Sequence, residues 1–302
     1  PMWIQKLRAG VTHIAYSLDG RTLYTLDTGG VLTAWDTATH TGSSLTVAYH
    51  RHNRGIWGIY LIDDGRLIVR SGGTFTAIDR SLMVGKLPSP PGLEPDQFAH
   101  VGSDGRVDYV VRDNVRQILG CHLGNTKAWP VFTLPESLGV LVGVHRFDWS
   151  RDRRTLAAIL MDGVLGGFDV TPGGDPPRPV RVVSVPNTYR IKLSPDGRTV
   201  VALSQYPDRV SLWDVATQTV RIRNVPMSFP GAAVAMNPVY PLFAACQADG
   251  TLAIWSLDDG RAVQSLDFAL GRAVRCVAFA PDGLTCAVGV TNKQFAVFAV
   301  DV

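Results

Sequence analysis

The chain has 302 residues, of which 46% are hydrophobic and 18% are charged, and this balance excludes a disordered chain and a coiled coil. Its 29 basic and 26 acidic residues leave a net charge of +3, too small an excess to indicate a nucleic-acid partner. No apolar run approaches the roughly 20 residues that a membrane helix needs, so no membrane association is expected.

Short strands separated by tight turns are the elements expected along the whole chain. An Asp-Gly-Arg turn, or a degenerate copy of it, recurs near residues 19, 64, 104, 152, 196, 239 and 282. A bounded apolar segment of strand length follows each turn. In chain order these segments are Thr22–Leu26, Leu67–Val69, Val107–Val111, Thr155–Leu160, Thr199–Leu203, Leu242–Cys246 and Thr285–Val288.

A second recurring feature, which we call the landmark, is a dipeptide that lies 14 to 17 residues after each turn. It consists of a large apolar residue followed by a small or acidic one. Its copies are Trp35-Asp36, Ile78-Asp79, Leu119-Gly120, Phe168-Asp169, Trp213-Asp214, Trp255-Ser256 and Phe298-Ala299. In the last three copies the turn prolines, Pro195, Pro238 and Pro281, are spaced 43 residues apart. The chain therefore holds seven repeats of one supersecondary unit.

The repeat length, the Asp-Gly turn and the Trp-Asp dipeptide resemble the WD-repeat family of β-propellers. The resemblance implies an all-β, seven-bladed β-propeller whose four-stranded antiparallel blades surround a central channel. It covers residues 1–302 as a single domain. The expected blades are residues 10–53, 54–94, 95–140, 141–185, 186–228, 229–269 and 270–302 together with 1–9.

The two ends of the chain fit together in this scheme. The last repeat stops after a third strand, residues 295–302, whereas a surplus strand-like segment, Met2–Leu7, precedes the first repeat. We therefore expect the N-terminal strand to complete the last blade, which removes an open sheet edge. The family's Gly-His dipeptide is missing, with only His52 near such a position, so its buried His–Asp–Ser–Trp hydrogen bonds are not expected in any blade.

No motif for catalysis, nucleotide binding or metal binding stands out along the chain. Glycine-rich residues 163–167 fit a strand-to-strand turn, and the acid pairs 63–64 and 258–259 each precede a glycine, as turn residues do. We therefore expect no enzyme activity, no cofactor and no metal. Cys276 and Cys286 lie on either side of one turn, and we expect them to be cross-strand neighbours that stay reduced in the cytoplasm.

These features favour a non-catalytic scaffold, a cytoplasmic and bacterial monomer, that binds a protein or peptide segment on the narrow face around the channel. The resemblance places two positions of each blade on that face: the start of the innermost strand and the loop between the second and third strands. The partner-binding residues expected there are Trp57, His145, Tyr189, Tyr206, Arg275, Arg112, Met161 and Lys293. Thr12, Gln97 and Ala232 occupy the first of these positions in other repeats, and Asn292 precedes Lys293 in the same loop.

Aromatic residues and arginine dominate the energetics of protein interfaces, which supports this choice. The aromatic side chains could instead cap the core. Two other functions stay open: a propeller enzyme acting on a small molecule at the channel mouth, and a sensor or recruiting domain of a longer protein. Arg51, His52, Arg54 and Trp57 could contact nucleic acid, but exposed loop arginines are the simpler explanation, so no nucleic-acid partner is expected.

Overall fold

A computed structural model provides the coordinates of the chain. It describes residues 2–47, 56–71, 74–79, 84–94, 97, 99–111, 114–134, 144–160, 164–170, 178–184, 188–204, 209–217, 219–226, 233–246, 251–266, 274–290 and 292–302. Within these ranges only the backbone is described at residues 56–57, 111, 114–115, 178–184, 209 and 221–226. The described regular structure is entirely β, and it contains no helix long and apolar enough to cross a membrane.

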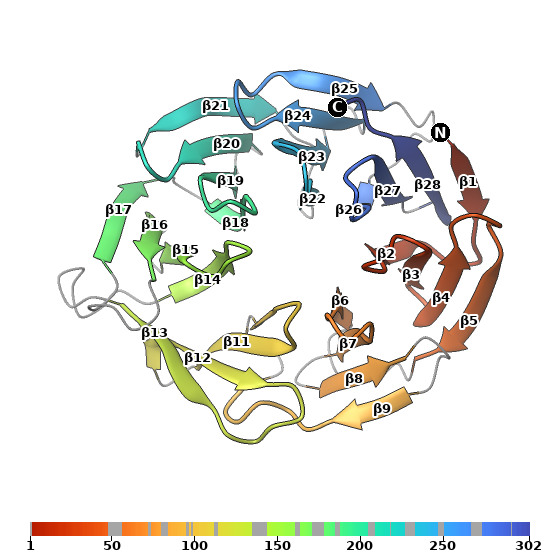
Figure 1. Cartoon of the computed structure of the whole chain (residues 1–302), viewed down its shortest axis with the longest axis horizontal. Helices are drawn as coiled ribbons and strands as arrows, with labels where there is room; N and C mark the ends of the chain where they lie inside the picture. The colour runs from red at the N-terminus through yellow and green to blue at the C-terminus, as the bar shows by residue number, and fades with distance from the viewer. Residues whose placement is uncertain are drawn as a thin grey trace. The chain divides into compact units, whose positions relative to one another are not determined.

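The strands form seven four-stranded antiparallel sheets, numbered blades 1 to 7, and the expected all-β class is confirmed (Figure 1). The contacts group the chain into two compact units. Unit 1, residues 1–87 and 227–302, holds blades 1, 2, 6 and 7. Unit 2, residues 88–226, holds blades 3, 4 and 5.

The four blades of unit 1 each consist of four consecutive strands, except that blade 7 takes its outermost strand from the N-terminus. Blade 1 contains β2 (Val11–Tyr16), β3 (Thr22–Asp27), β4 (Val31–Asp36) and β5 (Gly42–Thr46); blade 2 contains β6 (Ile56–Leu61), β7 (Leu67–Ser71), β8 (Thr74–Ile78) and β9 (Val84–Leu87); blade 6 contains β22 (Val234–Met236), β23 (Leu242–Cys246), β24 (Leu252–Ser256) and β25 (Ala262–Leu266); blade 7 contains β26 (Val274–Phe279), β27 (Thr285–Val290), β28 (Gln294–Ala299) and β1 (Trp3–Lys6).

The strands of unit 2 follow the same order. Blade 3 contains β10 (Ala99–Val101), β11 (Arg106–Val111), β12 (Asn114–His122) and β13 (Trp129–Thr133); blade 4 contains β14 (Val144–Trp149), β15 (Thr155–Leu160), β16 (Val164–Asp169) and β17 (Arg178–Ser184); blade 5 contains β18 (Thr188–Leu193), β19 (Thr199–Ser204), β20 (Arg209–Asp214) and β21 (Val220–Pro226).

Each blade has two ends because its strands run back and forth. The turn end holds the turns between the first and second strands and between the third and fourth. The loop end holds the start of the first strand and the connection between the second and third strands. Of the sequence-predicted binding residues that the structure describes, Trp57, His145, Tyr189, Arg275 and Lys293 belong to the loop end, and the Asp-Gly-Arg turns belong to the turn end.

The N-terminal strand completes blade 7, as expected. Strand β1 pairs antiparallel with β28, with Trp3 opposite Val297 and Lys6 opposite Gln294. Trp3 is buried, and its ring lies 4.7 Å from the ring of Phe295 and 5.8 Å from that of Trp35 in blade 1. The closing strand therefore contributes apolar packing as well as backbone hydrogen bonds.

Side-chain hydrogen bonds explain why the turn sequence recurs. In blade 1 the Ser17 hydroxyl donates to Asp19 over 2.6 Å and accepts the backbone N–H of Thr22 over 2.8 Å. Gly20 supplies the left-handed conformation, with φ of 71°, that the turn needs at little steric cost. The same serine–aspartate bond forms at Ser150 in blade 4 and at Ser194 in blade 5.

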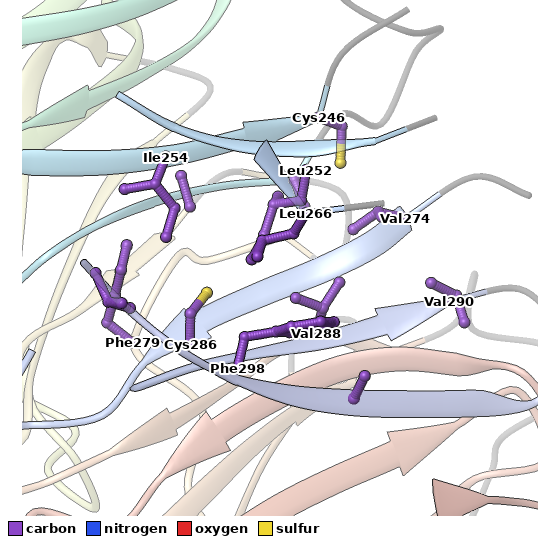
Figure 2. Packing of buried hydrophobic residues seen from close by; sticks show 14 of the residues in the cluster. Cys246, Leu252, Ile254, Leu266, Val274, Phe279, Cys286, Val288, Val290 and Phe298 are labelled. Carbon is purple, nitrogen blue, oxygen red and sulfur yellow. The ribbon is translucent and has the colours of Figure 1, made fainter. Parts of the chain in front are cut away.

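Neighbouring blades pack face to face through clusters of apolar side chains. One cluster joins blades 6 and 7 and includes Leu252, Ile254, Val288 and Phe298 (Figure 2). A second cluster joins blades 7 and 1 around Trp3 and its aromatic neighbours. Because each sheet presents alternate residues to its two faces, one strand contributes to both clusters.

This alternation corrects the expected placement of two cysteines. Cys286 faces blade 6 in the first cluster, whereas Cys276 packs into the second cluster toward blade 1. Cys276 lies opposite Gly289, and Cys286 lies opposite Phe279, so the two are not cross-strand neighbours. All four cysteines are free thiols. Burial raises the pKa of the thiols of both Cys276 and Cys286.

The third repeat also differs in detail from expectation. In blade 3 the second residue of β11, Val107, lies opposite Cys121. The landmark of this repeat is therefore Cys121-His122 rather than Leu119-Gly120. A register shift after Val110 accounts for the difference of two residues. In blade 1 the Trp35 indole donates to the Thr25 hydroxyl over 2.9 Å, and His52 lies outside the described residues.

Candidate functional site

A β-bulge occurs at the same place in the first strand of five blades. In each, one extra residue interrupts the pairing with the second strand. The bulged residues are Thr12, Trp57, His145, Tyr189 and Arg275. A bulge re-aims the side chain that it carries and is frequent beside functional sites. The repeat alignment predicts all five residues for the loop end, although it does not detect the bulges.

The exposure of these side chains follows their bulged position. His145 and Arg275 are exposed, and Thr12 and Tyr189 are half-buried. Only the backbone of Trp57 is described. Arg275 belongs to unit 1, whereas His145 and Tyr189 belong to unit 2. Each unit therefore presents some of the expected binding residues. That these residues form one patch stays a prediction.

The connections between the second and third strands are described in fewer blades. Arg112, Met161 and Tyr206 lie outside the described residues. Lys293 is exposed at the tip of the blade 7 connection, in a left-handed conformation with φ of 69°. Its carbonyl accepts the backbone N–H of Leu7 over 2.7 Å, so the closing strand helps to hold this connection.

Two further arginines at the loop end of unit 2 were not among the expected residues. Arg146 follows His145 directly, and Arg190 follows Tyr189 in the next blade. Burial lowers the pKa of Arg146, and the positive charge of Arg190 lowers it further. Burial and then Arg146 lower the pKa of His145. The loop ends of blades 4 and 5 thus place like charges close enough to repel one another.

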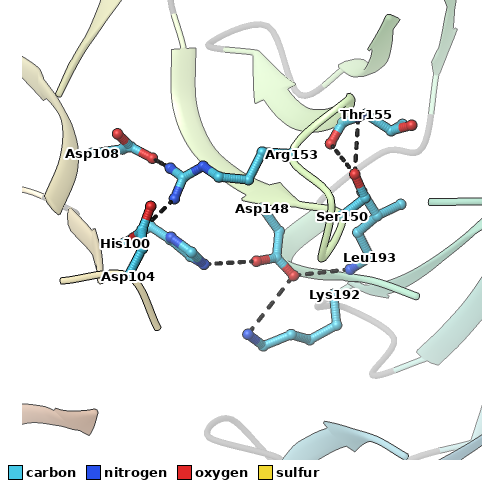
Figure 3. A network of polar contacts seen from close by, with 9 residues as sticks. All are labelled: His100, Asp104, Asp108, Asp148, Ser150, Arg153, Thr155, Lys192 and Leu193. Atoms are coloured by element: carbon cyan, nitrogen blue, oxygen red, sulfur yellow. Dashed lines mark hydrogen bonds and ion pairs between the residues drawn. The ribbon is translucent and has the colours of Figure 1, made fainter. Parts of the chain in front are cut away.

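A second polar site joins the first strands of all three blades in unit 2 (Figure 3). The buried carboxylate of Asp148 in β14 accepts the backbone N–H of Leu193 in β18 over 2.9 Å. The Lys192 ammonium lies 3.7 Å from the same carboxylate. From the other side, the Nε2 atom of His100 in β10 lies 3.4 Å from Asp148. Asp148 thereby ties blade 4 to both of its neighbours.

The turn of blade 4 supplies a further link to blade 3. Arg153 stands where most other turns have glycine, and it keeps the left-handed conformation with φ of 60°. Its guanidinium pairs with the fully buried carboxylate of Asp108 and lies 3.6 Å from Asp104. Arg106 lies 3.1 Å from the other oxygen of Asp108. These ion pairs offset the backbone strain of about 1 kcal/mol or more.

The electrostatics of this polar site predict a pH dependence of stability. Burial lowers the pKa of His100 to about 4, although the charge of Asp148 opposes the shift. The unfolded chain takes up a proton on this histidine near pH 6.5. The unfolded state therefore binds more protons between these values, so stability falls as the pH drops from about 6.5 toward 4, by at most roughly 3 kcal/mol.

Urea unfolding of the protein and of His100→Gln at pH 7.5 and pH 4.5 tests this expectation. The variant should lose less stability than the protein between the two pH values. His122→Gln, which changes an exposed histidine of the same blade, is the control and should keep the full loss. An equal loss in all three proteins would contradict the assignment.

Within the described ranges, no group of three or more histidine, cysteine or acidic residues could hold a metal ion. The side chains at the loop end can make cationic and aromatic contacts. Asp148 and Asp108 form internal ion pairs, because both carboxylates are buried and lie beside charged or titratable side chains of the adjoining blade.

Comparison with known proteins supports the architecture. No protein-family model matches the chain. Over 99% of its length it superposes on the whole β-propeller domain of Cps50 (Swd1) from Myceliophteria thermophila, with a TM-score of 0.70 and 13% sequence identity. The chain is a seven-bladed β-propeller. The expected seven-bladed propeller architecture, and with it the resemblance to WD-repeat propellers, is confirmed.

A sequence relative points in the same direction. Protein groucho of Drosophila melanogaster is 33% identical over 95 residues, which is 31% of this propeller. The chain spans 13% of the length of that relative.

Proposed function

We propose that this propeller is a non-catalytic scaffold whose loop end binds an acidic segment of a partner protein. The observation that carries the proposal is the recurrent bulge, which sets one residue apart at the start of the first strand in five blades. Trp57, His145, Tyr189 and Arg275 are the bulged residues of the types that dominate interfaces. Arg112, Tyr206, Met161 and Lys293 are proposed to extend the same surface.

The charge of the loop end determines the kind of partner. Arg275 and Lys293 in blade 7 are exposed cations, and in unit 2 the like charges of Arg146 and Arg190 repel one another. A carboxylate placed near such a pair relieves the repulsion and forms charge-assisted hydrogen bonds. An acidic peptide segment therefore fits this surface better than a neutral one. The partner is a protein, and the propeller acts on it by binding alone.

Arg190→Glu is the test variant for this proposal. The probe is an array of 12-residue peptides in which the number of Asp and Glu residues and the number of large apolar residues vary independently. We expect the protein to retain acidic peptides and Arg190→Glu to bind them at least thirtyfold more weakly, which corresponds to about 2 kcal/mol. Trp57→Ala and Arg275→Ala should weaken the binding of the same peptides without lowering the melting temperature of the protein.

Arg198→Glu is a matched control because Arg198 lies in the same blade, is exposed, and stands at the opposite turn end. It should leave acidic peptide binding unchanged. The proposal fails if the protein does not retain acidic peptides better than neutral ones, or if both charge reversals weaken acidic peptide binding equally. Binding should also weaken as salt is raised, because exposed charges are screened.

A further inference from the structure

The turn ends of blades 6 and 7 lack the charges that the other blades carry. In blades 1 to 5 the residue that ends the turn is an arginine, and an aspartate precedes it by two positions. Blade 6 has Val239 and Pro241 at these positions, and blade 7 keeps Asp282 but has Leu284 in place of the arginine. Two adjacent blades have therefore exchanged solvated charges for apolar side chains.

These apolar side chains are exposed. Val239 is 57% exposed and Leu284 is 43% exposed. The neighbouring turn of blade 1 adds Leu18, which is 48% exposed. Isolated exposed apolar residues need no explanation, but a group of them at adjoining positions marks an interaction surface.

The three turns adjoin one another within unit 1. The Asn237 amide of blade 6 donates to the carbonyl of Gly283 in blade 7 over 2.8 Å. On the other side, the Thr285 hydroxyl of blade 7 lies 3.5 Å from the Tyr16 hydroxyl of blade 1. A methyl group added at Gly20 of blade 1 would lie 3.6 Å from the Pro281 ring, so these two turns adjoin as well. The side chains of Leu18, Val239 and Leu284, which we name the apolar turn surface, therefore belong to one continuous group of turns.

Acidic side chains surround the apolar turn surface. The turns between the third and fourth strands of blades 1 and 6, and the segment that follows β28 in blade 7, lie at the same end. Backbone hydrogen bonds of 2.7 to 3.0 Å join each of them to the first turn of its blade. These five turns and the segment after β28 carry six exposed aspartates and two exposed arginines, Arg21 and Arg261. The aspartates are Asp19, Asp36, Asp258, Asp259, Asp282 and Asp301. Backbone N–H donors lower the pKa of Asp36 and Asp259, which keeps both ionised.

We propose that this turn end of blades 6, 7 and 1 is a second docking surface, for a protein segment that carries lysine or arginine beside large apolar side chains. Charge complementarity selects this occupant, since the apolar side chains would cover the apolar turn surface while the cations face the aspartates. The acidic surround disfavours a second copy docked through the same surface, because like charges would meet. It also disfavours a membrane, whose anionic headgroups repel aspartates.

The test variant restores the charges that the other blades carry. In the double variant Val239→Asp, Leu284→Arg, blade 7 regains the Asp-Gly-Arg turn and blade 6 regains the aspartate of the other blades. Both positions are exposed, so the melting temperature should stay close to that of the protein. The probe is a second array of 12-residue peptides, in which the numbers of basic and large apolar residues vary independently. Peptides with both should be retained best, and the double variant should bind them at least tenfold more weakly.

Two further variants make the result specific. Val84→Asp changes an equally exposed apolar residue on β9 of blade 2 and should leave binding unchanged. Asp258→Asn, Asp301→Asn should weaken binding severalfold and reduce its dependence on salt. Acidic peptides bound at the loop end should be unaffected by the double variant, so failure here and failure of the loop-end proposal are distinguishable.

Three outcomes would overturn the assignment. Peptides with basic and apolar residues could bind the double variant as tightly as they bind the protein. Alternatively, the turn-end variants could weaken the binding of acidic peptides only. Analytical ultracentrifugation could also show an oligomer of the protein that the double variant dissociates, in which case the occupant is another copy of this chain.

Discussion

Deleting residues 2–8 is expected to make the protein aggregate or to lower its melting temperature by more than about 10 °C. The deletion removes the whole of β1, so β28 becomes an open edge that can pair with another chain. It also removes Trp3 from a cluster with Trp35, Phe295 and His40. Loss of one large buried aromatic side chain costs about 3–5 kcal/mol, against a total stability of about 5–15 kcal/mol.

A pair of point variants separates the packing of β1 from its backbone pairing. Trp3→Ala removes the buried ring and should lower the melting temperature by on the order of 10 °C. Ile4→Ala is the matched control, because Ile4 lies on the same strand with half of its surface exposed. Its effect should be close to zero. A soluble deletion variant that melts with the parent would show that β1 does not hold blade 7 closed.

Replacing Asp108 by alanine is expected to destabilise the protein by about 3–5 kcal/mol. The carboxylate is fully buried and faces the guanidinium groups of Arg106 and Arg153. Without it, two partly buried cations remain side by side, and uncompensated buried charge is among the most costly defects in a folded protein. Thermal or urea unfolding measures the loss directly.

A rescue experiment tests the cause of this loss. The double variant Asp108→Leu, Arg153→Gly removes one cation together with the anion and places glycine where the backbone is left-handed. It should recover at least half of the stability that Asp108→Ala loses. Asp104→Ala, which removes a half-exposed carboxylate beside Arg153, should cost less than about 1 kcal/mol. Equal losses in the two alanine variants would contradict the importance of the buried pair.

The repeat pattern predicted the architecture because each turn depends on local chemistry. The serine, aspartate and glycine of a turn such as Ser194–Gly197 bond to one another within a few residues, so their order in the sequence determines their structure. The surplus first strand predicted closure for a similar reason, since a free sheet edge needs a partner. The third repeat misled the prediction because a register shift in β11 and β12 moves the landmark by two residues.

The interactions between blades could not be predicted in the same way. Cys276 and Cys286 lie close in sequence, yet a bulge at the start of β26 and the alternation of strand faces send them to different neighbours. Arg153 and Asp108 are 45 residues apart, and no local pattern connects them. At the loop end the repeat alignment found the bulged residues, but the repulsion between Arg146 and Arg190 depends on how two blades adjoin.

The pairing of β1 with β28 has a consequence for biosynthesis. Residue 3 finds its partner at residue 297, so almost the whole propeller must be translated before the last sheet can form. At about 5–20 residues per second, roughly 15–60 s separate the synthesis of the two strands. During that interval Trp3 lacks both the ring of Phe295 and the strand β28 with which its own strand pairs. The nascent chain therefore carries an exposed, aggregation-prone segment during that interval, which is the kind of segment that chaperones bind.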